Sequence, residues 1–423
     1  MSLWAFRFVL IYLGILLVQP QNRFLFLYPF RIAMVCMAVA TLLHIISASQ
    51  EGRPIIRFGP ATITALVLML LSYLSLKFGP MQVDKGWNSD IDIIFKNCIC
   101  LILIEAMANT VERVWAVLVT IMLATLWWVK GGIRLAMAGA TYAGDRLMGP
   151  AVSLVENPNG FAYFMTLMIP LHLYFYQQTQ NKYLRIGYLS LALTSVYIVL
   201  QTGSRTGLLA LLAVGLFLLP KYGRNHKLAI VVAGVAITII STSVGALNME
   251  RFKTIPDSIR SFLAGNVEEL DPRNMNADQH SAWERKMKNK HTWALIKSYP
   301  GFGVGVQPSN ALVTEKFEYA GGQVHNEILY AGRQMGFPGM MIYLAFMGIL
   351  LVNSVRIQRY ASTHWPALSD LGWTMKMQWL VFVVGGYFSP IPWNPLFLVI
   401  AACASACWMN IKNQSWNAAS SRF

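Results

Sequence analysis

His325 has the residue type and the position for acid/base chemistry. It ends the longest polar stretch of the chain, and an apolar run begins directly after Asn326 and Glu327. Histidine has an ordinary pKa close to neutral pH, so an imidazole can take a proton from a reacting hydroxyl group under physiological conditions. A histidine that merely caps the following helix is the alternative. We expect His325 to be catalytic, with Asn326 or Glu327 orienting its ring.

Three arginines could form an anion-binding group on the same side of the protein: Arg146, Arg205 and Arg285. Guanidinium groups bind phosphate oxygens through paired, charge-assisted hydrogen bonds, each contributing about 1.5–3 kcal/mol. Arg205 lies in a short Gly-Ser-Arg-Thr-Gly turn, where Ser204 and backbone amides can also approach a ligand. The alternatives are a helix-end arginine that reaches toward water for Arg146, and a solvated basic face for Arg285. Two or three such side chains could hold a pyrophosphate without a metal ion.

The sequence offers one candidate for a metal site, the pair Asp90 and Asp92. Two carboxylates at this spacing could bind a divalent cation, but they also begin a predicted helix, where acidic side chains interact favourably with the helix dipole. We favour the capping role. The usual zinc-binding and Walker-type patterns do not occur, and the five cysteines lie within apolar runs, as small core side chains do. We therefore expect a site without a metal or other cofactor.

The composition indicates that membrane helices position these residues. Of the 423 residues, 56% are hydrophobic and 13% are charged, and the mean hydropathy is +0.48. So little polar surface cannot coat a soluble globule of this length, whereas one membrane span needs about 17–25 mostly apolar residues. The sequence thus predicts an all-α polytopic membrane protein with about twelve transmembrane helices. The predicted spans are residues 3–18, 24–47, 58–76, 91–108, 112–128, 160–178, 184–201, 204–219, 227–247, 326–353, 373–388 and 394–411.

The net charge of +15 is interpreted as a topology signal, because the basic residues are dispersed over short loops and are not gathered on a soluble domain. With the N-terminus in the cytoplasm, the inner loops collect many of the arginines and lysines. We therefore predict that both termini are cytoplasmic and that the protein contacts membrane lipids, not nucleic acid.

This topology leaves two long connections on the outer face, residues 129–159 and 248–325, and function should be sought there. The second connection is rich in charges of both signs and is predicted to fold as a small helical subdomain outside the membrane. The predicted organisation is nine transmembrane helices over 1–247, the subdomain over 248–325, three more helices over 326–411 and a cytoplasmic tail over 412–423.

Two features of the subdomain bear on the site. Residues 281–298 have apolar side chains at helical spacing, which predicts a helix lying over the membrane domain. The glycine-rich residues 301–305 follow it. We interpret them as a tight irregular turn near a substrate and not as a dinucleotide fingerprint, because no predicted strand precedes them.

Four segments together resemble the bacterial O-antigen ligases and the related O-antigen polymerases and O-glycosylation ligases. The resemblance covers roughly residues 125–345 in addition to the overall topology, and it rests on the order and placement of the segments. They are residues 129–132 (VKGG) leading to Arg146 and to residues 156–160 (ENPNG); residues 202–207 (TGSRTG); residues 293–305 with the core YPGFGVG; and His325-Asn326 followed by residues 336–339 (GFPG).

The resemblance implies a membrane glycosyltransferase of the GT-C type in the bacterial inner membrane, with a periplasmic active site. Its reaction would transfer a glycan from undecaprenyl pyrophosphate to the lipid A-core oligosaccharide, with inversion and without a metal. Carried over by motif, Arg205 and Arg285 would bind the pyrophosphate and Arg146 would assist. His325 would act on the acceptor hydroxyl, with Ser204 and Asn326 in supporting positions.

Several alternatives stay open at this point. The match around Arg285 is the loosest, so the second phosphate-binding arginine could instead be Arg260 or Arg273. An O-antigen polymerase, or a ligase that attaches glycans to protein, would use the same donor on the same face. A lipid-linked glycan flippase or another transporter also fits the span count, but it would need charged side chains near the middle of several helices, for which the sequence has few candidates.

Overall fold

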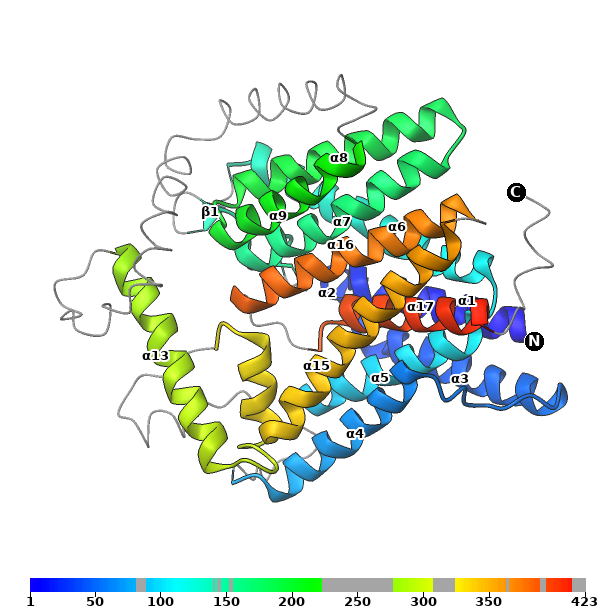
Figure 1. Cartoon of the computed structure of the whole chain (residues 1–423), viewed down its shortest axis with the longest axis horizontal. Coiled ribbons are helices and arrows are strands. Elements are labelled where there is room, and N and C mark those ends of the chain that lie inside the picture. The colour runs from blue at the N-terminus through cyan, green and yellow to red at the C-terminus, as the bar shows by residue number, and fades with distance from the viewer. Residues whose placement is uncertain are drawn as a thin grey trace.

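The computed structural model describes residues 1–80, 89–139, 141–142, 146–151, 155–222, 277–306, 324–362, 365–388 and 393–412. Within these ranges the chain is almost wholly helical (Figure 1). A two-residue antiparallel ladder joins β1 (Thr141–Tyr142) to β2 (Arg146–Leu147). The helices are α1 (Ser2–Val18), α2 (Pro20–Arg23), the 3-10 helix η1 (Leu25–Phe30), α3 (Ile32–Gln50), α4 (Pro60–Phe78), α5 (Ser89–Met107), α6 (Val111–Met137), α7 (Pro158–Gln178), α8 (Lys182–Gln201), α9 (Arg205–Tyr222), α13 (Ala277–Ser298), α15 (Glu327–Ala361), α16 (Pro366–Phe388) and α17 (Pro395–Lys412).

The apolar helices confirm an all-α, multi-pass membrane protein. Among the described residues, six helices are long and apolar enough to cross a membrane, and two shorter apolar helices accompany them, Ser2–Val18 and Arg205–Leu218. Every apolar run expected from the sequence coincides with a helix, apart from residues 227–247, which lie outside the described ranges. The total of twelve spans stays a prediction.

The core lies where helices that are apolar on all sides meet. α7 and α17 are buried over most of their length, as expected of helices that other helices surround. By contrast, α4 exposes large apolar side chains such as Ile63 and Leu70 on the surface where lipid would lie. At the centre, the rings of Phe382 in α16 and Phe397 in α17 lie 4.8 Å apart. Between membrane helices such contacts contribute through close packing, because lipid tails are as apolar as these side chains.

α15 is bent back on itself at Gly336. This residue has φ 67° and ψ −160°, a combination that residues with a side chain rarely adopt, and a Cβ here would lie 2.2 Å from the carbonyl oxygen of Pro300. The two halves of α15 pack closely, because a Cβ on Gly339 would lie 2.4 Å from the carbonyl oxygen of Ala331. Figure 1 shows the change of direction between the yellow and orange parts of α15. The single apolar run expected at 326–353 is therefore two helical segments.

α13 confirms the helix expected at 281–298 and lies across one end of the bundle (Figure 1). It packs on α15, where the rings of Trp293 and Phe337 meet edge to face at 5.9 Å. The glycine-rich turn after α13 also bonds to α15, since the N–H of Val304 donates to the carbonyl oxygen of Arg333 (2.8 Å). This turn therefore anchors α13 at the bend of α15.

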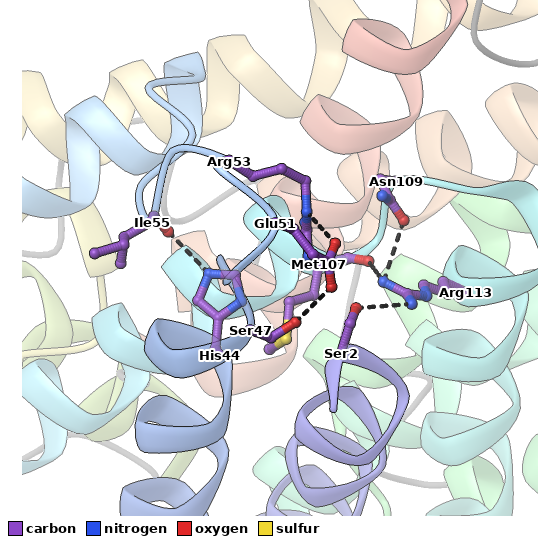
Figure 2. A network of polar contacts seen from close by, with 9 residues as sticks. All are labelled: Ser2, His44, Ser47, Glu51, Arg53, Ile55, Met107, Asn109 and Arg113. Atoms are coloured by element: carbon purple, nitrogen blue, oxygen red, sulfur yellow. Dashed lines mark hydrogen bonds and ion pairs between the residues drawn. The ribbon is translucent and has the colours of Figure 1, made fainter. Parts of the chain in front are cut away.

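The other end of the bundle, where the N-terminus lies, carries a network of polar contacts between loops and helix ends (Figure 2). Arg113 at the start of α6 donates hydrogen bonds to the Ser2 hydroxyl (3.2 Å) and to the carbonyl oxygen of Met107 (2.8 Å). Beyond α3, Glu51 forms an ion pair with Arg53 (2.6 Å). Basic residues that the sequence places on the inner face thus hold helix ends together.

Candidate functional site

Local hydrogen bonds shape the short turn that carries Arg205. α8 ends just before Thr202, whose hydroxyl donates to the carbonyl oxygen of Val199 (2.7 Å). Ser204 precedes α9, and its Oγ accepts the N–H of Gly207 (3.1 Å), as helix-capping serines do. Arg205 is the first residue of α9. Its positive charge therefore lies at a helix N-terminus, where the helix dipole also favours an anion.

Arg146, on β2, binds this same turn. Its Nε donates to the carbonyl oxygen of Thr202 (3.0 Å), and its Nη2 donates to Oδ1 of Asn159 (2.6 Å). The same Asn159 oxygen accepts a hydrogen bond from the hydroxyl of Ser204 (3.0 Å). β2, the start of α7 and the turn before α9 thus meet around one amide oxygen. These contacts make Arg146 part of the scaffold of the turn, and its role in donor binding stays a prediction.

Arg285 lies near Arg205 although it belongs to α13. Its pKa is lowered from the ordinary arginine value, first by burial and then by the positive charge of Arg205, while Glu284 acts in the opposite direction. Arginine nevertheless stays protonated in proteins, so the fold holds two cations close enough to repel each other. An anion bound between them would remove this repulsion. The structure therefore brings together two of the three arginines that the sequence singles out.

His325 directly precedes α15, and Asn326 is the N-cap residue of that helix. The Asn326 Oδ1 accepts the N–H of Leu329 (3.0 Å). Capping is thus done by Asn326, which removes the alternative that His325 serves as the cap. The His325 side chain is partly buried. The cap fixes the backbone next to His325, and the supporting role of Asn326 in the reaction stays a prediction.

Glu327, the first residue of α15, is buried inside the bundle with 2% of its surface exposed. The hydroxyl of Tyr343 donates a hydrogen bond to its Oε2. Gly386 of α16 leaves room for this carboxyl group, because a Cβ there would lie 2.5 Å from Oε2. A carboxyl group inside a membrane protein is costly unless it is hydrogen-bonded. The bond joins the two halves of α15 and so fastens the segment that follows His325.

α13 links the two parts of the candidate site. It carries Arg285 beside Arg205, and it packs on α15, whose first residues follow His325. Figure 1 shows α13, β1 and the yellow first half of α15 on the same side of the bundle. Arg260 and Arg273, the other candidates in the subdomain, lie outside the described residues.

One of the two carboxylates of the metal alternative has another partner in the part of the chain that the structure describes. Asp92 forms an ion pair with Lys96 one helical turn along α5, and the side chain of Asp90 lies outside the described residues. In the described ranges no group of three His, Cys, Asp or Glu side chains could hold a metal ion. The five cysteines are free, and four of them are buried, which agrees with their expected place in the core.

Two residues that position the site were not assigned a role from the sequence. Asn159 lies at the start of the apolar run that forms α7. A polar amide just inside an apolar run is the feature of the sequence that could have pointed to a role for it. Tyr343 lies in the second half of α15, 16 residues after its partner Glu327. A tyrosine in an apolar run carries no such signal, because its partner depends on how α15 bends.

Two family models match the chain. One, described as O-Antigen ligase, matches residues 190–344, which include Arg205, Arg285 and His325. The other, described as a family of unknown function (DUF5935), matches residues 4–180, which include Arg146 and Asn159. No curated protein matches the chain. Residues 190–344, which hold the paired arginines and the histidine, thus match the O-antigen ligase family.

Proposed function

We propose that this protein transfers a glycan from undecaprenyl pyrophosphate to the lipid A-core oligosaccharide on the periplasmic face of the bacterial inner membrane. The observation that carries the proposal is the pairing of Arg205 and Arg285, two cations held together by separate helices. The family match supports membrane glycan transfer in general. The proposal includes twelve spans, a GT-C-type organisation and cytoplasmic termini.

The donor would be held by its two phosphate groups. A pyrophosphate diester carries two negative charges, which match the two guanidinium groups in number and in bidentate geometry. Arg205 adds the N-terminus of α9, whose dipole and backbone amides favour the same anion. The polyprenyl tail would stay in the lipid, while the sugars reach the candidate site beside α13.

In the transfer step, the acceptor hydroxyl attacks the anomeric carbon of the donor sugar from the face opposite the pyrophosphate. A bond forms between the acceptor oxygen and the anomeric carbon, the bond from that carbon to the phosphate oxygen breaks, and the configuration inverts. His325 takes the proton of the hydroxyl group. Arg205 and Arg285 stabilise the charge that develops on the departing undecaprenyl pyrophosphate, so the proposed reaction needs no metal ion.

A reconstituted transfer assay tests this function. The full chain in lipid nanodiscs would receive a lipid-linked glycan donor together with one of three acceptors: lipid A-core, a second lipid-linked glycan, or an acceptor protein. Transfer to lipid A-core, undiminished by excess chelator, is the expected result. Transfer to the lipid-linked glycan alone would instead show a polymerase, and transfer to protein alone a protein glycan ligase. Movement of the donor across the bilayer without a new glycosidic bond would show a transporter.

Variants of matched residue type separate the site from general damage. His325→Ala and Arg205→Ala are each expected to lower transfer by about 100-fold or more. The same variants, expressed in a strain that lacks its own ligase, should leave lipopolysaccharide with few long glycan chains. His280→Ala, which alters an exposed histidine of α13, and Arg134→Ala, which alters an exposed arginine of α6, should retain transfer. Full activity in His325→Ala would remove the proposed base.

A further inference from the structure

A polar pocket lies far from the candidate site, between the C-terminal end of α15 and the N-terminal part of α16. It has a volume of about 350 Å³, which falls within the range of about 300–1,000 Å³ typical of small-ligand pockets. Tyr343, which contacts Glu327 near the candidate site, and Gln358, which lines the pocket, both lie on α15. At 1.5 Å per residue, about 22 Å of helix separates them. Its lining residues are Val355, Gln358, Arg359, Ser362, Ser369 and Lys376.

The pocket is cationic. Arg359 and Lys376 line it, and none of the described lining side chains is acidic. The acidic residue of α16, Asp370, does not line the pocket, and its carboxylate accepts a hydrogen bond from Gln178 of α7 (3.2 Å). Two positive charges in one pocket without a lining carboxylate attract an anion.

Gln358 holds the walls of the pocket in place. Its Oε1 accepts a hydrogen bond from Nζ of Lys376 (2.8 Å), and its backbone carbonyl accepts one from the hydroxyl of Ser369 (3.1 Å). Both bonds cross from α16 to α15. The partner of Lys376 in this bond is a neutral amide. The pocket is thus shaped before a ligand arrives, which lowers the entropic cost of binding.

The surroundings of the pocket have the character of a membrane surface. α15 is long and apolar enough to cross a membrane and ends at Ala361, directly beside the pocket. On the same end of α15, the rings of Tyr360 and Trp408 meet edge to face (6.4 Å), and Arg356 lies over the Trp408 ring (5.6 Å). Aromatic and basic side chains gather in this way where a helix passes the lipid headgroups, and basic pockets between helices at that level bind anionic headgroups.

We propose that Arg359 and Lys376 bind the phosphate group of an anionic phospholipid in this pocket, at the end of α15 opposite the candidate site. The shared chemistry is a phosphate oxygen held by a guanidinium and an ammonium group. A lipid headgroup is the favoured source because the pocket opens beside the end of a spanning helix. The site is independent of the proposed glycan transfer and would exist whatever the acceptor.

Native mass spectrometry of the detergent-solubilised full chain, titrated with phosphatidylglycerol or with phosphatidylcholine, measures the binding directly. One phosphatidylglycerol should bind in preference to phosphatidylcholine. A basic residue near an anionic lipid surface contributes about a fivefold gain in affinity. Arg359→Gln and Lys376→Met should each weaken binding about fivefold, and the double variant about 25-fold. Arg359→Lys keeps the charge and should bind nearly as the wild type does.

Arg356→Gln is the matched control, because it removes a cation from the same end of α15 that does not line the pocket. A loss in Arg356→Gln as large as in Arg359→Gln, or equal binding by the double variant and the wild type, would overturn the proposal. In a second experiment, inorganic phosphate is added and the melting temperature is measured. A rise in the wild type that the double variant lacks would support a phosphate site in the pocket, with free phosphate as the source. If the double variant fails to fold, the single exposed change Arg359→Gln gives the same comparison.

Discussion

Tyr343 donates a hydrogen bond to the carboxyl group of Glu327 from the opposite half of the bent helix α15. Both side chains are buried, each with 2% of its surface exposed. Because Glu327 is the first residue of α15 and Gly336 reverses its direction, this bond helps to join the segment next to His325 to the long half of the helix. The position of the candidate base therefore depends on a contact that lies inside the bundle.

Removal of this contact should lower both stability and transfer. Tyr343→Phe leaves a buried carboxyl oxygen without its donor, at a cost of about 1–3 kcal/mol. The expected result is a lower melting temperature together with a reduced kcat for transfer. Tyr360→Phe, which removes an exposed hydroxyl at the other end of α15, is the control and should change neither quantity. A Tyr343→Phe protein with wild-type kcat would show that the contact does not position the site.

The pair of arginines should bind a pyrophosphate anion without any sugar present. A ligand at 100 times its Kd stabilises the folded state by about 2.7 kcal/mol, so geranyl pyrophosphate should raise the melting temperature of the wild-type protein. Arg285→Gln should lose this rise, because one of two guanidinium groups is gone. Arg134→Ala should keep it. An equal rise in the melting temperatures of the wild type and Arg285→Gln would show that the pyrophosphate binds at another place.

Arg146 and Arg205 should act together and not independently. Arg146 bonds to the carbonyl oxygen of Thr202 and shares Asn159 with Ser204, so Arg146→Ala loosens the turn that carries Arg205. We expect kcat/KM for transfer to fall by about tenfold or more, since each lost hydrogen bond is worth about 0.5–1.5 kcal/mol.

The double-mutant cycle distinguishes support from direct donor binding. If Arg146 acts by holding the turn, its removal should cost little once Arg205 has been replaced by Ala. Fully additive losses in the Arg146→Ala, Arg205→Ala protein would instead show that Arg146 contributes its own contact to the donor. Such a result would restore the role that the sequence first predicts for it.

The polar network at the other end of the bundle should give a small acid sensitivity (Figure 2). Hydrogen bonds from Arg53 and from Ser47 lower the pKa of Glu51. A carboxyl group with a lowered folded-state pKa contributes stability that is present above its unfolded-state pKa and is lost as the pH falls through the lowered value. Melting temperatures between pH 6 and pH 3 should therefore fall less for Glu51→Gln than for the wild type. Parallel curves would contradict this role.

The sequence predicts the helices well because their signal is local. Apolar runs of sufficient length locate the spans, and spacing within residues 281–298 locates α13. The bend of α15 is different. Gly336 has many possible roles in a sequence, and its positive φ follows from the packing of the turn after α13 against it, which no local pattern contains.

The candidate site was predicted only in its chemistry. Arg205 and Arg285 are recognisable as cations beside apolar runs, but their proximity depends on how α13 crosses the bundle. The scaffold of the site is also divided between the two matched regions, since Arg146 and Asn159 belong to residues 4–180 whereas Thr202 and Ser204 belong to residues 190–344. The first region, of unknown function, thus supplies support for the turn of the second.

The central claim is that Arg205 and Arg285 are kept together for the donor's pyrophosphate at a cost to the folded state. Burial and like charge lower the pKa of Arg285, and this penalty is complete at neutral pH because arginine stays protonated there. The most direct measurement is transfer by purified Arg285→Gln, with its melting temperature recorded on the same sample. The account predicts a fall in transfer of about 100-fold or more with a melting temperature equal to or above that of the wild type. Transfer within about threefold of the wild type, or a loss that merely follows unfolding, would contradict it.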